Sequence, residues 1–396
     1  MAAHDSIVIA GSARTPIGAF QGDLKDSAAP ELGAAVIRAS MERAGIPFDA
    51  IDEVFMGCVL AAGLRQAPAR QAALGAGLPS STGATTINKM CGSGMKAAMI
   101  AHDMLLAGSA NTIVAGGMES MSNAPYLLDR ARGGYRMGHG QVFDHMYYDG
   151  LEDAYDKGRL MGAFGEECAQ SYAFTREAQD AYALASLERA QKATADGSFA
   201  SEIVPIKVKA GKTERLVSQD ELPLKATPEK IPHLKPAFRE GGTVTAANSS
   251  GISDGAAALV VMRRSEAERR GLRPLAAIVG HASYANVPAL FPTAPIGAIR
   301  ALLERTGWTA GDVDLFEINE AFAVVAMAAM RDLGLPHEKV NVHGGACALG
   351  HPIGASGARI VVTLLAALAK YDLKRGIAAI CIGGGEATAM AIERVS

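Results

Sequence analysis

The chain of 396 residues is long enough to form two or three domains, each with its own hydrophobic core. Hydrophobic residues make up 49% of the sequence and charged residues 20%, which is typical of a soluble globular protein and excludes a disordered or fibrous one. The net charge of -3 gives no indication of binding to nucleic acid.

The N-terminal residues 6–10 read as a strand, and they have the features of neither a secretory signal nor a transit peptide. The longest apolar runs, such as residues 360–369, are too short to span a bilayer. The five cysteines include no Cys-x-x-Cys pair, which argues against a disulfide framework and a structural zinc site. We therefore expect a cytoplasmic protein that does not act at a membrane.

Several segments of the chain occur twice. A helical pattern that ends at a glycine C-cap, followed by an acidic turn and a strand, is present in both halves of the sequence. A strand that runs into paired glycines and a final apolar strand are also present in both halves. The matching pairs are residues 36–45 with 298–307, 113–117 with 380–384, and 255–264 with 385–394. The strand that ends at residues 87–88 likewise matches one that is expected to end at residues 340–341.

This repeat predicts two copies of a β-α-β-α-β-α-β-β unit. Its last two strands abut in the second copy, whereas in the first they are separated by an insertion. We therefore expect an N-terminal half (1–117 and 255–273), an inserted loop domain (118–254) and a C-terminal half (274–396). Two related halves would stack as an α/β fold with a layered α/β/α/β/α body. Two separate Rossmann-like domains are the less favoured alternative.

The insertion has a mixed composition. It contains a stretch rich in glycine, methionine and tyrosine (133–148), a helical pattern (175–195) and a basic extended segment after Pro205. Residues 207–239 carry eight basic residues against four acidic ones. This basic excess fits either a solvated face or a surface that binds an anion.

Cys91 is the first candidate for chemistry. A short β-like run ends at Ile87, and a helical pattern begins near Met95, so Cys91 lies where a strand passes into a helix. The unpaired N–H groups and the dipole at a helix N-terminus favour a thiolate, which is the nucleophilic form of cysteine. The adjacent glycines allow a substrate to come close.

Three further residues stand out in the second half. His351 lies among glycines in the loop that matches the Cys91 loop, and it precedes a proline. Cys381 ends a strand that runs into three glycines, although a lone strand cysteine is usually a small buried hydrophobe. Asn319 follows an apolar strand, where a plain N-cap is the alternative interpretation. The other cysteines, Cys58, Cys168 and Cys347, are expected to be packing residues.

A cysteine at a helix start, a histidine and a second cysteine indicate nucleophilic catalysis with a separate acid or base. The chain resembles the thiolase family along essentially its whole length. The resemblance rests on four blocks, residues 88–94, 319–322, 341–357 and 381–385.

The resemblance implies a role for each block. Cys91 would carry the acyl group as a thioester, and His351 would take the proton from Cys91. Cys381 would remove the α-proton of the second acetyl-CoA. Asn319 would hold a water that stabilises the enolate oxygen, and the N–H groups of Cys91 and Gly383 would form a second oxyanion hole. No metal or redox cofactor is required.

The resemblance also implies contacts with coenzyme A and with the acyl chain. Ser250 matches a family serine that contacts the pantetheine arm, and Lys225 is a candidate phosphate contact. Met161, Phe238 and Phe291 fall where the family lines its acyl pocket. Short-chain members commonly have histidine where this chain has Leu160, and methionine where it has Phe291.

We therefore expect an acetyl-CoA C-acetyltransferase that interconverts two acetyl-CoA with acetoacetyl-CoA and CoA. The alternative is a broader 3-ketoacyl-CoA thiolase of fatty-acid breakdown. The family also implies a homotetramer. A dinucleotide-dependent oxidoreductase is suggested by the G-x-G-x-x-A pattern at residues 92–97, but the acidic residue expected about 20 positions on is absent, because Thr112 lies there. A non-catalytic carrier of lipid or CoA is a third class.

Overall fold

The structure is a computed structural model that describes residues 5–395. Helices and strands alternate through both ends of the chain, as the internal repeat predicts. Those of the first half are β1 (Ile7–Arg14), β2 (Gly18–Ala19), α1 (Ala29–Ala44), β3 (Glu53–Gly57), α2 (Pro68–Ala76), β4 (Gly83–Ile87), α3 (Ser93–Ala107), β5 (Thr112–Ser120), β10 (Ser253–Arg263) and α7 (Arg264–Arg269).

The second half repeats this order without a counterpart of the short β2, and it lacks one further strand. Its elements are β11 (Ala276–Ala285), α8 (Ala294–Thr306), β12 (Leu315–Ile318), α9 (Ala323–Leu333), α10 (Ala346–Leu349), α11 (Ile353–Lys370), β13 (Arg375–Ile382) and β14 (Glu386–Arg394). The missing element is the strand predicted to end at Asn341, where Val340 forms only a single bridge with Phe316. The side-chain amide of Asn341 bonds both the N–H and the C=O of Ile318 at 2.8 Å, so it takes the place of a strand ladder.

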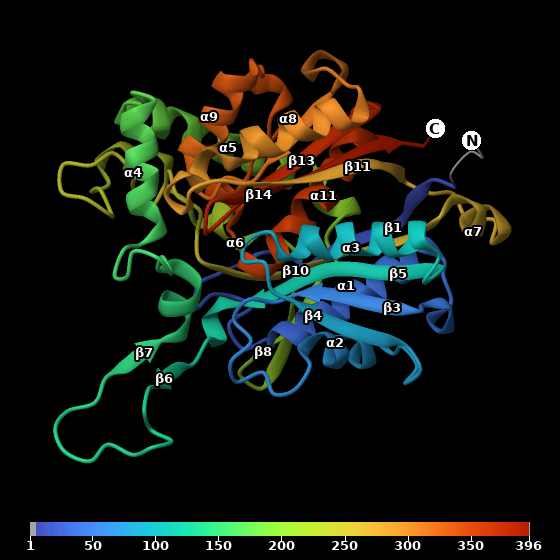
Figure 1. The fold of residues 1–396 in the computed structure, drawn as a ribbon, viewed down its shortest axis with the longest axis horizontal. Coiled ribbons are helices and arrows are strands. Elements are labelled where there is room, and N and C mark those ends of the chain that lie inside the picture. Colours follow the sequence, from blue (N-terminus) through green and yellow to red (C-terminus); the bar gives the residue numbers. More distant parts are fainter. Residues whose placement is uncertain (1–4, 396) are drawn as a thin grey trace.

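Between β5 and β10 of the first half lies an inserted segment of hairpins and helices. It contains β6 (Tyr126–Leu128), β7 (Val142–Asp144), α4 (Met161–Ser171), α5 (Arg176–Ala195), β8 (Ile206–Ala210), β9 (Thr213–Val217) and α6 (Glu221–Lys225). α5 follows the predicted helix closely, because the Thr175 hydroxyl caps it by accepting from Ala178 N at 3.2 Å. The β6–β7 hairpin projects away from the body of the molecule (Figure 1).

One ten-stranded sheet runs through the molecule in the order β12-β13-β14-β11-β1-β10-β5-β3-β4, with β2 paired to β10. The two halves therefore meet edge to edge, where β1 and β11 pair through only two residue pairs, Val8 with Ala277 and Ile9 with Ala276. β3 runs parallel to β4 and β5, and β12 runs parallel to β13, whereas the remaining pairs are antiparallel.

The helices complete the layers, which can be followed in Figure 1. α1 and α2 pack on the outer face of the first-half strands, and α8 packs on the outer face of the second-half strands. α3 and α11 pack against each other and contact strands of both halves, so they form the middle layer. One hydrophobic core lies beneath the outer helices of each half, and a third surrounds the middle helix layer and reaches the strands of both halves. The predicted layered α/β fold is confirmed.

The inserted segment leaves the sheet after β5 and returns at β10. Ser120 and Asp254 lie opposite each other on these two strands, so the sheet continues across the interruption. The division into 1–117 with 255–273, 118–254 and 274–396 stays a prediction. Residues 1–4 and 396 of those ranges lie outside the described residues.

α11 is longer than the apolar run noted in the sequence. Among residues 5–395 it is the one helix that could cross a membrane by length and composition, with a mean hydropathy of 1.5. However, 83% of the helix is buried inside the structure. A core helix packed between sheets passes the same test, so the feature is weak evidence for a membrane span.

Candidate active site

Cys91 lies in a tight turn between the edge strand β4 and helix α3. Met90 adopts a left-handed conformation with φ 46°, which is uncommon for a residue with a side chain. Ser93 holds the turn, because its hydroxyl donates to Met90 O at 2.6 Å and accepts from Lys89 N at 2.8 Å. The helix begins at Ser93 with Gly92 as its N-cap, so Cys91 precedes the helix instead of opening it.

The glycines after Cys91 are needed for close packing. A Cβ on Gly92 would lie 2.4 Å from Cδ1 of Ile382, the residue that follows Cys381. A Cβ on Gly94 would lie 2.8 Å from Ala358 N. The missing side chains therefore let the end of β13 and helix α11 approach the Cys91 turn, and they account for the G-x-G pattern without a bound dinucleotide.

The three predicted catalytic side chains meet in one place. Cys91, His351 and Cys381 line a common cavity of about 290 Å³, together with Gly383. Cys381 is the second-last residue of β13, and Gly383 is the first residue after that strand. The loop sequences of the two halves thus converge on the same edge of the molecule, as the repeat predicts.

His351 is held in one orientation by its neighbours. Its backbone N–H donates to Gly251 O at 2.9 Å, and its ring Nδ1 lies 2.5 Å from the hydroxyl of Ser356. That hydroxyl donates its own proton to Pro352 O at 2.9 Å, so it accepts a hydrogen bond from Nδ1–H. The lone pair of His351 is therefore on Nε2, which has no partner among the described residues. Burial lowers the pKa of His351 to about 3, so the ring is neutral at rest and Nε2 carries a free lone pair.

The protonation state of Cys91 differs from the prediction. Burial raises the pKa of its thiol to about 11, although the N–H groups of Gly383 and of Cys91 itself lower the pKa in part. The expectation that the helix start favours a thiolate is therefore wrong for the resting site, because the loss of hydration outweighs the backbone donors. Cys91 is a thiol at neutral pH and needs a base to become a nucleophile.

Cys381 is more deeply buried than Cys91, with 1% of its surface exposed. Burial raises the pKa of Cys381 well above its usual range, and the nearby sulfur of Cys91 raises it further. A thiolate formed here is a strong base in a site largely closed to water. Such a base suits a carbon acid, whose proton is weakly acidic.

Asn319 lies behind the cavity and does not line it. It is fully buried, and its side-chain oxygen accepts from Arg359 Nη2 at 3.5 Å. Its Nδ2 has no partner among the described residues, so it can donate to a water or substrate oxygen. Asn319 is not the N-cap of α9, because that helix begins at Ala323 with Phe322 as its cap.

A chain of three cavities leads away from Cys91. The cavity around Cys91 shares Met161 and Ser250 with a second cavity of about 610 Å³, which Leu160 and Phe238 also line. The second cavity shares Leu222, Ala246 and Gly251 with a third of about 300 Å³.

Aromatic rings enclose the inner end of this chain of cavities. Phe291 lines the innermost cavity and is 3% exposed. The ring of Phe322 lies 6.4 Å from that of Phe291 and 5.9 Å from that of Phe238. These contacts fix the width of the space beside Cys91.

Lys225 lines the third, outermost cavity together with Lys230. Its ammonium group pairs with the Glu221 carboxylate, which raises the pKa of Lys225. The side chain is 63% exposed, so it is free to turn toward an incoming anion. Its role as a phosphate contact stays a prediction, as do the roles of the other site residues.

Two residues of the site were missed in the sequence. Ser356 fixes the tautomer of His351, and its only signal is its position at the first turn of the helix that follows. Glu119 is fully buried on β5, and it accepts from the N–H groups of Val59 at 3.0 Å, Leu60 at 3.1 Å and Gly354 at 2.8 Å. Burial raises the pKa of Glu119 to about 6. A lone acidic residue inside an apolar strand was the signal for it.

Comparison with known proteins identifies the family. Residues 7–265 match the model of the thiolase N-terminal domain, and residues 272–394 match that of the thiolase C-terminal domain. The chain belongs to the thiolase family. It is therefore an acyltransferase, and the predicted family and enzyme class are confirmed.

Relatives match over nearly their whole length. The chain is 51% identical to an acetyl-CoA acetyltransferase of Escherichia coli K12 over 391 residues, which cover 98% of this chain and 99% of the relative. It is 49% identical to one from Cupriavidus necator, with the same shares covered over 395 residues.

Solved structures of thiolases have the same fold. An acetyl-CoA acetyltransferase of Bacillus anthracis superposes with a TM-score of 0.96 at 42% identity, and all of both chains is covered. The Acat5 thiolase of Ascaris suum, solved in complex with coenzyme A, superposes with a TM-score of 0.93 at 41% identity, which covers 98% of this chain and 100% of that one.

Proposed function

We propose that the protein is an acetyl-CoA C-acetyltransferase that interconverts two acetyl-CoA with acetoacetyl-CoA and CoA. The observation that carries the mechanism is the unpartnered Nε2 of a neutral His351 in the cavity that also holds Cys91 and Cys381. The full-length relatives named acetyl-CoA acetyltransferase support the substrate.

The first half-reaction loads the enzyme. His351 Nε2 takes the thiol proton of Cys91, and the sulfur attacks the carbonyl carbon of acetyl-CoA. The backbone N–H groups of Cys91 and Gly383 stabilise the oxyanion. When the bond to CoA breaks, the departing sulfur takes a proton from Cys381. The site then holds an acetyl thioester, a protonated His351 and a Cys381 thiolate.

The second half-reaction forms the carbon–carbon bond. The Cys381 thiolate removes the α-proton of a second acetyl-CoA, and the enolate oxygen accepts hydrogen bonds from protonated His351 and from a water held by Asn319. The enolate carbon attacks the thioester on Cys91. The Cys91 sulfur leaves with the proton of His351, so all three groups return to their starting states.

Mass spectrometry separates the two steps. Wild-type enzyme treated with acetyl-CoA should gain one acetyl group on Cys91. Cys381→Ala should gain it more slowly, because the departing CoA sulfur loses its proton donor, and should lose condensation. Cys91→Ala should lose both. Cys168→Ala is the matched control, because Cys168 is buried but lines none of the three cavities. Acetylation of another residue, or condensation by Cys91→Ala at the wild-type rate, would overturn the mechanism.

The chain length of the acyl group decides between the two thiolase activities. Phe291, Phe322 and Phe238 close around the site and favour a short acyl chain. The alternative, a broader 3-ketoacyl-CoA thiolase of fatty-acid breakdown, requires room for a long chain. Thiolysis rates with four-carbon and sixteen-carbon 3-ketoacyl-CoA test this, and faster turnover of the long substrate would reject acetyl specificity. The thiolysis rate of an α-methylated four-carbon 3-ketoacyl-CoA measures whether the site beside Phe291 accepts a branch at the α-carbon.

Coenzyme A would occupy the chain of cavities from Cys91 past Ser250 to Lys225. The substrates are thus acetyl-CoA, acetoacetyl-CoA and CoA, with no bound metal or redox cofactor and no nucleic acid or membrane as partner. Lys225→Ala together with Lys230→Ala should raise the KM for acetyl-CoA while leaving kcat nearly unchanged.

The proposed assembly is a homotetramer in the cytoplasm. The projecting β6–β7 hairpin exposes Tyr126, Leu128 and Val142 at 68%, 59% and 61%, an apolar surface that fits contact with another copy. The five free cysteines fit a reducing compartment. Light scattering on the eluted protein measures the mass of the assembly, and a monomer would reject the tetramer.

A further inference from the structure

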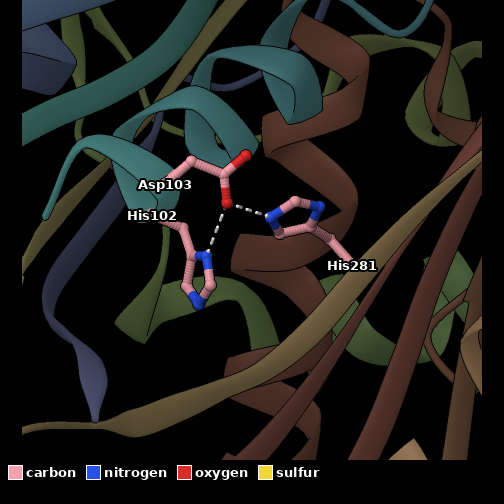
Figure 2. A group of neighbouring side chains, drawn as sticks. All are labelled: His102, Asp103 and His281. Carbon is pink, nitrogen blue, oxygen red and sulfur yellow. Dashed lines mark hydrogen bonds and ion pairs between the residues drawn. The ribbon is translucent and has the colours of Figure 1, made fainter. Parts of the chain in front are cut away.

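A second group of reactive side chains lies far from Cys91. His102 and Asp103 are on α3, and His281 is on β11 of the other half of the molecule. Figure 2 shows both imidazole rings turned toward one oxygen of the Asp103 carboxylate. His102 Nδ1 lies 3.1 Å from Asp103 Oδ1, and His281 Nε2 lies 2.9 Å from the same atom.

The spacing of these atoms is close to that of a metal site. One ligand atom from each residue lies within 4.8 Å of the other two. Zinc–ligand distances of about 2.0–2.1 Å give a tetrahedron whose ligands are roughly 3.3 Å apart. The two nitrogen–oxygen separations are already near that value, and the two nitrogens lie within 4.8 Å of each other.

The two rings are held in place, whereas the carboxylate faces solvent. The side chains of His102 and His281 are 12% and 11% exposed, and their rings pack edge to face with centroids 4.9 Å apart. The Asp103 side chain is 61% exposed. An ion can therefore enter from solvent and meet two nitrogens that cannot move far.

We propose that His102, Asp103 and His281 bind a divalent transition-metal ion, with Zn²⁺ as the best-matched ion and water at the remaining position. Imidazole and carboxylate together suit zinc, whereas magnesium and calcium take oxygen ligands. On binding, each ring presents the lone pair of the nitrogen that now faces Asp103, and its proton resides on the opposite nitrogen. No oxidation or reduction is involved.

The ion would fasten the two halves of the molecule to each other. His102 lies roughly 14 Å along α3 from Ser93, given a rise of about 1.5 Å per residue, so the site is separate from the acyl-transfer chemistry. Its ligands come from the middle helix layer of the first half and from the sheet of the second half. A bound ion should therefore stabilise the fold by linkage.

One neighbouring charge opposes the ion. The Arg305 guanidinium donates to the carbonyl oxygen of His281. Burial lowers the pKa of His281, and the charges of His102 and Arg305 lower it further, whereas Asp103 raises it.

The test uses tag-free full-length protein carrying Cys91→Ala and Cys381→Ala, so that the active-site thiols cannot hold the metal. Titration with ZnCl₂ in a calorimeter should give one equivalent per chain, and zinc should raise the melting temperature. Adding His281→Gln should weaken this binding at least tenfold and abolish the rise. Adding His139→Gln, at an exposed histidine of the segment between β6 and β7, should change neither.

Two outcomes overturn the proposal. One is no saturable uptake at millimolar zinc, and the other is equal uptake by the His281→Gln and His139→Gln proteins. Melting curves without metal check that the His281→Gln protein folds. If it does not, Asp103→Asn takes its place, because that side chain is mostly exposed and its loss should also weaken zinc binding.

Discussion

At the scale of single residues, the site depends on which nitrogen of His351 carries the proton. Ser356 donates to Pro352 O and so can only accept from His351 Nδ1–H. This arrangement directs the basic nitrogen at the cavity. Because burial keeps Cys91 a thiol, the reaction depends on that nitrogen to form the nucleophile.

Replacing Ser356 tests this positioning role. In Ser356→Ala the ring loses its acceptor and exchanges between tautomers, so kcat should fall about 10–100-fold, a part of what a general base contributes. KM should change little, because Ser356 lines none of the three cavities. Ser356→Thr keeps the hydroxyl and should restore most of kcat. Steady-state kinetics measures both, and an unchanged kcat in Ser356→Ala would contradict the role.

The sequence identified the reactive residues but not their protonation. Cys91, His351 and Cys381 stand beside glycines or proline in loops that the repeat makes equivalent, so their convergence could be predicted. The pKa of Cys91 could not, because it depends on how residues of the insertion, such as Tyr148 and Tyr155, cover the cavity. Sequence distance gives no measure of that burial.

At the scale of elements, the Glu119 carboxylate on β5 joins two loops. Its oxygens accept from Val59 and Leu60 after β3 and from Gly354 at the start of α11. Gly354 lies three residues after His351, and its lack of a Cβ lets it approach Cys58, whose N would be 3.2 Å from that atom. Glu119 therefore sets the position of the loop that carries the base.

Glu119→Gln should weaken the hydrogen bonds that connect these two loops. An amide has only one acceptor oxygen, so its NH₂ group must face at least one buried N–H, at a cost of about 1–3 kcal/mol in the free energy of unfolding. kcat should fall as well, because the His351 loop loses its fixed position. Urea denaturation and kinetics measure the two effects. Glu31→Gln, at an exposed carboxylate that accepts from Ala28 N, should change stability by less.

Element boundaries were predictable where local chemistry decides them. The Thr175 cap and the glycine after α8 mark helix ends that the sequence shows directly. The strand predicted before Asn341 is different, because the side chain of Asn341 takes over the hydrogen bonds of Ile318. A side chain can take the place of strand hydrogen bonds only where the two segments lie side by side, and no local sequence pattern reveals that.

At the scale of the whole molecule, buried histidines link the fold to pH. His343 is 2% exposed, and neither of its ring nitrogens has a partner among the described residues. Burial, together with the nearby charge of Lys370, lowers the pKa of His343 to about 4. The folded state therefore holds a neutral ring at pH values where the unfolded chain already binds a proton.

Acid should therefore destabilise the protein through His343. The pKa of His343 in the folded protein lies below its value of about 6.5 in the unfolded chain. The free energy of unfolding is therefore unaffected by His343 above pH 6.5, and it falls by up to about 3 kcal/mol as the pH decreases toward 4. His343→Phe should flatten this part of the stability profile, while His139→Gln should not. Urea denaturation between pH 4 and pH 6.5 measures how steeply the free energy of unfolding changes with pH. Equal slopes for His343→Phe and the parent would contradict the role of His343.

The layered architecture was predictable because the two halves repeat the same apolar patterns. The repeat did not show which strand edges meet. β1 and β11 join the halves through two residue pairs, and other strands are equally apolar. The choice follows from packing of α3 and α11 against both halves, which is a property of the assembled core.

The place of β1 in the sheet also has a consequence for biosynthesis. β1 is the first strand to leave the ribosome, yet both of its neighbours, β10 and β11, are translated only after residue 252. At about 5–20 residues per second the nascent chain carries this apolar strand unpaired for roughly ten seconds or more. Protection of that strand during synthesis is therefore a requirement of the topology itself.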